Sequence, residues 1–171
     1  KTRKEFRREV IKNKPLDLGH VVFEEAVKRV LHFPAVGSKQ FLITIGDRSI
    51  TGLVACQQMV GPWQVPVSDV AVMHHDYDGY TGEAFSVGER SPLAKINPAA
   101  AARMAIAESL TNLVSADCDS LERVVFSANW MAASGSNIED QSLFDSVKAI
   151  GEDLCPQLGM AVPVGKDSLS M

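Results

Sequence analysis

Residues 97–116 read NPAAAARMAIAESLTNLVSA, and this stretch predicts the helix around which the rest of the domain is arranged. Asn97 is a residue type that caps the free N–H groups of a first helical turn. Pro98 suits the first helical position, where a missing N–H costs nothing. Apolar residues recur through the segment at helical spacing and predict a stripe that faces a core: Ile106, Leu110, Leu113 and Val114.

The opposite side of this predicted helix combines small residues with two polar ones. Ala101, Ala105, Glu108 and Asn112 share it, because residues four apart lie on one face of a helix. Small side chains would let another group approach closely, and the carboxylate and the amide would offer oxygens to a hard cation such as Mg²⁺. From spacing alone, a polar turn on the protein surface is the commoner explanation of such a pair.

The composition limits the class of protein. The chain has 171 residues, of which 46% are hydrophobic and 22% charged, and this balance is typical of a globular domain with a core. The net charge of −4 argues against a dedicated nucleic-acid binder, because phosphate contacts need clustered Lys and Arg. Basic residues cluster once, in KTRKEFRREVIKNK at residues 1–14, where a solvated amphipathic helix or a linker explains them.

Cysteine usage and hydropathy indicate the compartment. The three cysteines are odd in number and far apart, and they predict neither a disulfide framework nor a metal site: Cys56, Cys118 and Cys155. No apolar run reaches the roughly 18 residues of a membrane span, and no signal peptide is evident. We therefore expect a cytoplasmic protein without a membrane or nucleic-acid partner. The chain begins without Met inside a basic segment and stops at SLSM, so we expect a piece of a larger protein.

The pattern along the chain predicts two parts, which are linker or docking helices over residues 1–33 and a domain over residues 34–171. Helices are expected at 1–14, 20–33, 97–116 and 139–158. Strands are expected at 40–45, 67–75, 82–87, 121–127 and 160–164. These elements are mixed without regular βαβ units. The sequence therefore predicts an α+β fold, or a two-layer α/β sandwich, with a mixed sheet covered by helices.

Polar candidates for chemistry gather in four predicted loops, at residues 46–48, 66–69, 88–90 and 165–168. Asp69 stands at the start of an apolar strand, where it is either a metal ligand or a cap of the strand end. Lys166 follows a glycine but lacks the preceding spacing of a phosphate-binding P-loop. The spacing assigns no role to three further charged residues, namely Asp47, Arg90 and Asp167.

Five motifs, in chain order, carry a resemblance to a known family. They are FLITIGDRSITGLVACQQMVGPWQVPVSDVAV, GEAFSVGERSP, AIAESLTN, FSANWMAA and CPQLGMAVPVGKDSLSM. They resemble the phosphoribosylformylglycinamidine synthase family, in its large single-chain bacterial form, from about Leu31 to Met171. The resemblance implies the nucleotide-binding subdomain of the second half of the synthetase domain. This subdomain is similar to the N-terminal domain of aminoimidazole ribonucleotide synthetase.

The resemblance also implies a reaction and its cofactors. The family is a ligase of purine biosynthesis that uses ATP, glutamine and formylglycinamide ribonucleotide to make the amidine. By position in the motifs, Asp69, Glu108 and Asn112 would bind Mg²⁺, while Lys39 and Ser68 would contact ATP or ADP. No catalytic residue is assigned, and the Cys–His–Glu machinery of a glutamine amidotransferase is not expected within this chain.

The implied partners are the remaining synthetase and glutaminase domains of the same enzyme. Alone, the chain is expected to be inactive. It is also expected to pair through its sheet as a homodimer, because superfamily members join two such subdomains in this way. In large family members this half holds an auxiliary nucleotide tightly. The alternative function is therefore a non-catalytic, structural module that binds nucleotide and pairs with a subdomain. Both hypotheses require the same ligands.

Overall fold

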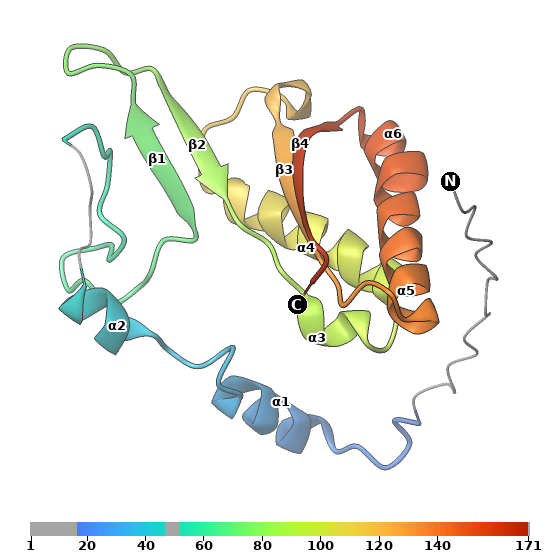
Figure 1. Cartoon of the computed structure of the whole chain (residues 1–171). Helices are drawn as coiled ribbons and strands as arrows, with labels where there is room; N and C mark the ends of the chain where they lie inside the picture. The colour runs from blue at the N-terminus through green and yellow to red at the C-terminus, as the bar shows by residue number, and fades with distance from the viewer. Residues whose placement is uncertain (1–16, 47–51, 171) are drawn as a thin grey trace. The chain divides into compact units, whose positions relative to one another are not determined.

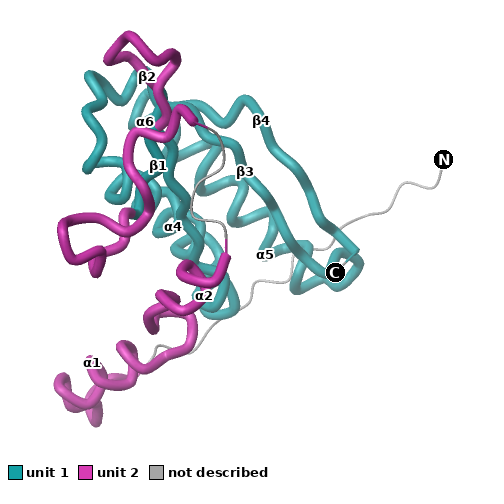
Figure 2. Tube along the Cα trace, turned by 90° about the vertical axis from the view of Figure 1, so that its left-hand side faces the viewer, with its two compact units in different colours: residues 1–13, 69–72, 83–171 teal, residues 14–68, 73–82 magenta. Residues whose placement is uncertain are grey.

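The structure is a computed structural model that describes residues 17–46 and 52–170. The predicted helix over residues 1–14 and the candidate Asp47 lie outside the described residues. The chain divides into two compact units, which Figure 2 shows in separate colours. One unit holds residues 69–72 and 83–170 of the described chain, and the other holds 17–46, 52–68 and 73–82. The predicted boundary between residues 33 and 34 stays a prediction.

The helix α4 (Pro98–Leu113) begins where the sequence predicts it. The side chain of Asn97 accepts a hydrogen bond from the backbone N–H of Ala100 at 3.0 Å, and Pro98 occupies the first helical position. The helix ends three residues earlier than expected, at Leu113, which is buried. Val114, predicted as part of the core stripe, is 80% exposed just past this end, so that part of the prediction is wrong.

The strands β3 (Val125–Met131) and β4 (Ala161–Ser168) run parallel and pair from Val125 opposite Ala161 to Met131 opposite Ser168. Helical segments connect them (Figure 1), so these elements form a βαβ unit, whereas the pattern along the chain predicts no regular βαβ unit. β4 is longer than predicted and includes residues 165–168, expected as a loop. The reason is that backbone pairing with β3 orders this strand although most of its residues are exposed.

The crossover between these strands is the predicted long helix, divided into three parts. They are α5 (Asn137–Lys148), a π-helical segment η2 (Ala149–Leu154) and α6 (Cys155–Leu158). Pro156 explains the irregular middle part, because proline removes an N–H and crowds the preceding turn. Gly159, with φ at 67°, ends the helix in the left-handed conformation, as predicted.

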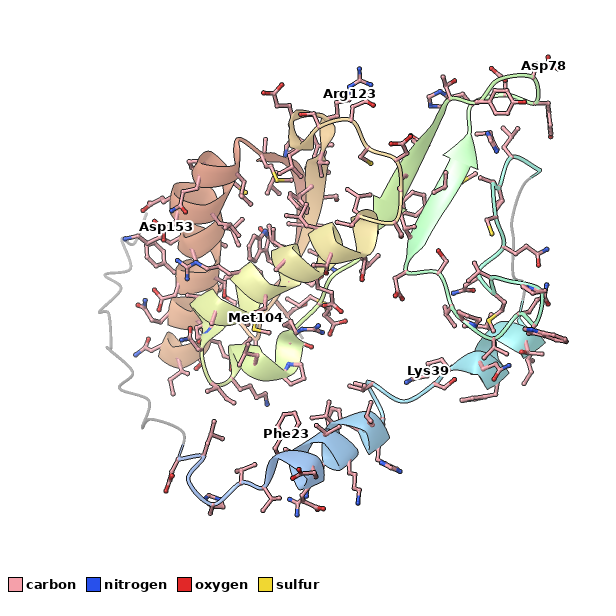
Figure 3. All side chains as sticks on the ribbon, turned by 180° about the vertical axis from the view of Figure 1, so that it is seen from behind. Phe23, Lys39, Asp78, Met104, Arg123 and Asp153 are labelled. Carbon is pink, nitrogen blue, oxygen red and sulfur yellow. The ribbon has the colours of Figure 1, made fainter. Side chains whose placement is uncertain are left out.

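The core of this unit lies where α4 packs against α5 and η2 (Figure 1). Its buried side chains are apolar, and they belong to α4, to the crossover and to the residue before β4: Ala101, Leu113, Ala149, Ile150, Cys155 and Met160. At the surface of this interface, the Arg103 guanidinium lies 2.9 Å from the Asp153 carboxylate, which Figure 3 labels. A short 3₁₀ turn, η1 (Leu121–Arg123), precedes β3, so the strand starts four residues later than predicted.

The strands β1 (Val70–His74) and β2 (Gly82–Ser86) form a second, antiparallel two-stranded sheet (Figure 1). Both confirm predicted strands; β1 is shorter than predicted at both ends, and β2 is shorter by one residue at its C-terminal end. A four-residue helix, α3 (Ser91–Ala94), follows the loop at residues 87–90 and leads into α4. Together, the antiparallel and parallel sheets with their helices confirm the predicted α+β fold.

The other unit contains α1 (Phe23–His32) and α2 (Gln40–Ile45). The first confirms a predicted helix, but the second was predicted as a strand, and that prediction is wrong. Its hydrogen bonds are local, from the Thr44 hydroxyl to Gln40 O at 2.8 Å and from Gly46 N to Leu42 O at 3.0 Å. Within the described chain no strand pairs with this segment, and β-branched residues favour a strand only beside such a neighbour. Among the described helices, none is long and apolar enough to cross a membrane.

Candidate functional site

Two of the predicted metal ligands lie on the side of α4 that borders a solvent-open depression of about 290 Å³. Met104, labelled on α4 in Figure 3, marks one part of its wall. The other lining residues come from the same helix and from the preceding loop: Arg90, Ala107, Glu108, Thr111 and Asn112. The structure therefore brings Glu108 and Asn112 together, as their spacing predicts, and adds Arg90 to them.

The Glu108 carboxylate is held through one of its two oxygens. Oε2 accepts a hydrogen bond from the backbone N–H of Glu89 and an ion-pair contact from Arg90 Nη1, both at 2.9 Å. The side chain is 26% exposed, so this carboxylate is partly screened from water. Among the described contacts none uses Oε1, and this oxygen remains for a ligand.

The Asn112 amide is oriented by the same loop. Its Nδ2 donates a hydrogen bond to the carbonyl oxygen of Val87 at 3.0 Å, which places Oδ1 on the opposite side of the amide group. The loop at residues 87–90 therefore holds each side chain through one of its two polar atoms, which are Oε2 of Glu108 and Nδ2 of Asn112. Two oxygens one helical turn apart remain for a cation, Glu108 Oε1 and Asn112 Oδ1.

The small-residue face of α4 receives this loop. A Cβ atom placed on Gly88 would lie 2.0 Å from the Ala105 carbonyl oxygen and 2.7 Å from the Ser109 nitrogen, so only glycine fits there. The Ser86 hydroxyl adds a half-buried hydrogen bond to Ser109 O at 2.6 Å. The small residues of α4 predicted that another group approaches this face closely. In this part of the helix, that group is the backbone of the loop at Gly88.

The oxygen donors of the depression fit Mg²⁺. This cation takes oxygen ligands and usually binds only one or two protein carboxylates, with waters and phosphate oxygens completing its shell. A carboxylate and an amide oxygen on one helix face meet that requirement. Across the described residues there is no group of three or more His, Cys, Asp or Glu that could hold a metal ion.

The other predicted site residues are not joined to this pair. Asp69 is exposed and directly precedes β1, and no described hydrogen bond or ion pair links it to Glu108 or Asn112. Lys39 and Ser68 belong to the second compact unit. There, Lys39 Nζ donates to the carbonyl oxygens of Pro34 and Gly37. Ser68 is half-buried next to Asp69. Their expected contacts with metal and nucleotide stay predictions.

Arg90 is the residue of this site to which sequence reasoning gave no role. It lies outside the helix and pairs with a glutamate 18 positions later in the chain. The available signal in the sequence was a cation in a Gly-containing loop that leads toward a predicted helix. Asp167, another residue without a role, lies in β4 opposite Trp130 and not in the predicted loop.

Among the described residues, two groups have shifted pKa values, and both lie outside the lining of the depression. The backbone N–H groups of Gly79 and Asp78 donate to Asp76 and lower the pKa of its carboxyl group. Burial raises the pKa of the Cys155 thiol. The first shift belongs to a tight turn and the second to the helix core, so neither indicates an acid or base at the candidate site.

Comparison with known protein families tests the resemblance. The family model described as the FGAR-AT PurM_N-like domain matches residues 38–171. FGAR-AT denotes formylglycinamide ribonucleotide amidotransferase, the enzyme that the five motifs resemble. The match covers both sheets, α4 and the entire depression, and it confirms the predicted family. The chain therefore belongs to the FGAR-AT PurM_N-like domain family, which is made of synthetase domains related to this ligase of purine biosynthesis.

Proposed function

We propose that this chain binds a magnesium–nucleotide complex, ATP or ADP, as one subdomain of a glutamine-dependent ligase. The observation that carries the proposal is the arrangement of Glu108 and Asn112. They lie one turn apart on α4 beside an open depression. The described loop contacts use Glu108 Oε2 and Asn112 Nδ2, and they do not use Glu108 Oε1 or Asn112 Oδ1. The family match supports the nucleotide-dependent synthetase as the setting.

In the proposed reaction, the amide oxygen of formylglycinamide ribonucleotide attacks the γ-phosphorus of ATP, and ADP leaves. Ammonia, released from glutamine in a separate glutaminase domain, then adds to the activated carbon and displaces phosphate to give the amidine. Mg²⁺, when bound, neutralises phosphate charge, which phosphoryl transfer needs more than covalent catalysis. The proposed task of this chain is to hold and orient the phosphates.

The residues divide this task in the proposal. Glu108 and Asn112 supply oxygens from the helix, and Asp69 supplies a third from the start of β1. Lys39 adds a point charge to the phosphates, and Ser68 contacts the nucleotide beside Asp69. If the Asp69 and Glu108 carboxylates share one cation, they repel each other when the cation is absent. The cation and the nucleotide are therefore expected to bind together.

A second candidate is a structural module, in which the nucleotide does not turn over and stabilises the pairing of subdomains. The observation that favours it is the exposure of large apolar side chains across the described chain, together with a core of few buried residues. Side chains that are three-quarters or more exposed include Phe23, Ile45, Trp63, Tyr77, Tyr80, Val87 and Val114. Such surfaces suit contact with the remaining synthetase and glutaminase domains or, in the isolated chain, with a second copy.

Calorimetric titration with Mg-ADP, in full-length protein stripped of retained nucleotide, tests the binding site. Replacing Glu108 by Ala should weaken binding by about 1–3 kcal/mol, the usual scale for losing a charge-assisted contact. Glu152→Ala is the matched control, because Glu152 is a helical glutamate that only forms an exposed pair with Lys148. Equal affinity for Mg-ADP in wild type and Glu108→Ala would show that Glu108 and Asn112 form an ordinary polar surface turn.

The same variant separates the two candidates. If the nucleotide turns over at this site, Glu108→Ala should lower amidine formation far more than the folded fraction accounts for, although the melting temperature of the ligand-free protein falls slightly with the loss of the Glu89 and Arg90 contacts. If the nucleotide is structural, the protein should lose the thermal stabilisation that ADP confers, and activity should fall only with the folded fraction.

A further inference from the structure

Arg90 is held in the depression by only part of its guanidinium group. Nη1 makes both of its described contacts, to Glu108 Oε2 at 2.9 Å and to the Glu89 carbonyl oxygen at 3.0 Å. Nothing in the described part of the chain bonds to Nε or Nη2. The side chain is 43% exposed and lines the depression beside Glu108, Thr111 and Asn112. A planar guanidinium with unused donors is suited to phosphate, which it binds through two parallel hydrogen bonds.

The charges at the site favour the binding of an anion together with any cation. A carboxylate that is already paired with an arginine has little net charge to attract a cation, and the guanidinium repels a divalent ion brought close to it. A cation that arrives with a diphosphate removes this difficulty, because the phosphate oxygens neutralise both positive groups. The Arg90–Glu108 pair therefore disfavours a bare cation and favours a cation that carries phosphate.

We propose that Arg90 is a phosphate-binding residue of this site, and that its juxtaposition with Glu108 makes cation binding depend on the phosphate group. This inference rests on the proposed function and extends it to a residue outside the predicted ligand set. Nε and Nη2 donate to phosphate oxygens, while Glu89 N–H continues to hold Glu108 Oε2. A purely structural Arg90 would instead support the loop through the Glu89 carbonyl and would act equally on every ligand.

The test compares Mn²⁺, as a paramagnetic substitute for Mg²⁺, with and without ADP in the full-length protein. Electron paramagnetic resonance titration measures bound Mn²⁺, and only binding that Glu108→Ala abolishes is counted. Arg90→Gln should leave the affinity for Mn²⁺ alone unchanged or raise it about two- to five-fold, since an exposed ion pair is worth at most about that factor. The same variant should lower the affinity for Mn²⁺ with ADP about ten-fold or more.

Two further variants sharpen the comparison. Arg90→Lys keeps the charge without the planar fork, so it should fall between wild type and Arg90→Gln, and it carries the test where the glutamine variant does not fold. Arg103→Gln is the matched control. Arg103 lies on α4, is also 43% exposed and also forms a 2.9 Å ion pair, but it does not line the depression. It should change neither affinity.

The outcomes are distinct. Equal weakening of Mn²⁺ with and without ADP would overturn the inference in favour of a structural role, as would an ADP-dependent affinity within two-fold of wild type. An equal loss in Arg103→Gln would show a general charge effect and would also overturn it. Wild-type protein without any Glu108-dependent binding of Mn²⁺ and ADP would refute the proposed function itself.

Discussion

Gly88 is the position where a single methyl group tests how the site is assembled. In Gly88→Ala, the new Cβ would lie 2.0 Å from the Ala105 carbonyl oxygen, 2.5 Å from the Ser109 hydroxyl and 2.7 Å from the Ser109 nitrogen. Two of these three atoms are backbone of α4, which cannot rotate away. Because carbon contacts are optimal near 3.5 Å, the loop must move from the helix by more than about 1 Å.

The cost of this movement follows from the contacts that the loop makes. Overpacking of this kind destabilises proteins by about 1–3 kcal/mol. The shift also strains three hydrogen bonds, from Asn112 Nδ2 to Val87 O, from Glu89 N to Glu108 Oε2 and from the Ser86 hydroxyl to α4. Loss of one of these adds about 1 kcal/mol, so the expected decrease in the free energy of unfolding is about 2–4 kcal/mol.

Urea unfolding of the chain, followed by far-ultraviolet circular dichroism, measures this change. With a typical slope of about 2 kcal/mol per molar urea, the midpoint should fall by about 1–2 M. Gly151→Ala is the control, because its Cβ meets no atom within 4 Å, and it should leave the protein equally stable or stabilise it slightly. A midpoint for Gly88→Ala equal to wild type would show that the loop does not pack on α4 as described.

Two other changes test the elements that position the site. Replacing Asn97 by Ala removes the hydrogen bond to Ala100 N and should cost about 1 kcal/mol in urea unfolding, whereas Asn97→Ser should keep most of it; equal midpoints for all three proteins would contradict the cap. Cys155 is buried and has a raised pKa, so iodoacetamide should modify the two exposed cysteines first and Cys155 only on unfolding. The contribution of the Cys155 thiol to the free energy of unfolding should be complete below the pKa of the unfolded thiol and lost as the pH rises through the higher pKa of the folded state. Rapid modification of all three thiols in native protein would refute the burial of Cys155.

Helix positions were predictable from the sequence because their determinants are local. The Asn97 cap and Pro98 fix the start of α4 within one turn, and Gly159 fixes the end of α6 by its left-handed backbone. The core stripe was predictable only in part. Leu113 is buried, but Val114 lies beyond the point where the helix ends, and periodicity alone does not reveal that end.

Strand predictions failed where pairing depends on distant segments. Residues 40–45 have the β-branched and aromatic composition of a strand, yet they form α2 with only local hydrogen bonds. Residues 165–168 have the polar composition of a loop, yet they extend β4 because β3 provides a parallel partner. In both cases the deciding factor is a neighbouring strand, which no local pattern contains. The βαβ connection of β3 and β4 was missed for the same reason.

The candidate site was predictable to the extent that it lies on one helix. The spacing of Glu108 and Asn112 placed them on one face, and the structure confirms that they border the same depression. The partners that orient them come from a loop 19 and 25 residues earlier in the chain, and this contact depends on how Gly88 meets α4. Arg90 enters the site through that contact, so no helical periodicity identifies it.

This dependence links the proposed binding to the stability of the fold. The loop at residues 87–90 joins β2 to α3 and α4, and it orients the two oxygens proposed to bind the cation. A ligand that requires both oxygens in these positions binds only the form in which the loop is packed on the helix. By linkage, such a ligand stabilises the packed form by an amount that grows with its concentration relative to its dissociation constant. A variant that loosens the loop, such as Gly88→Ala, must therefore weaken binding even though it leaves Glu108, Asn112 and Arg90 in place.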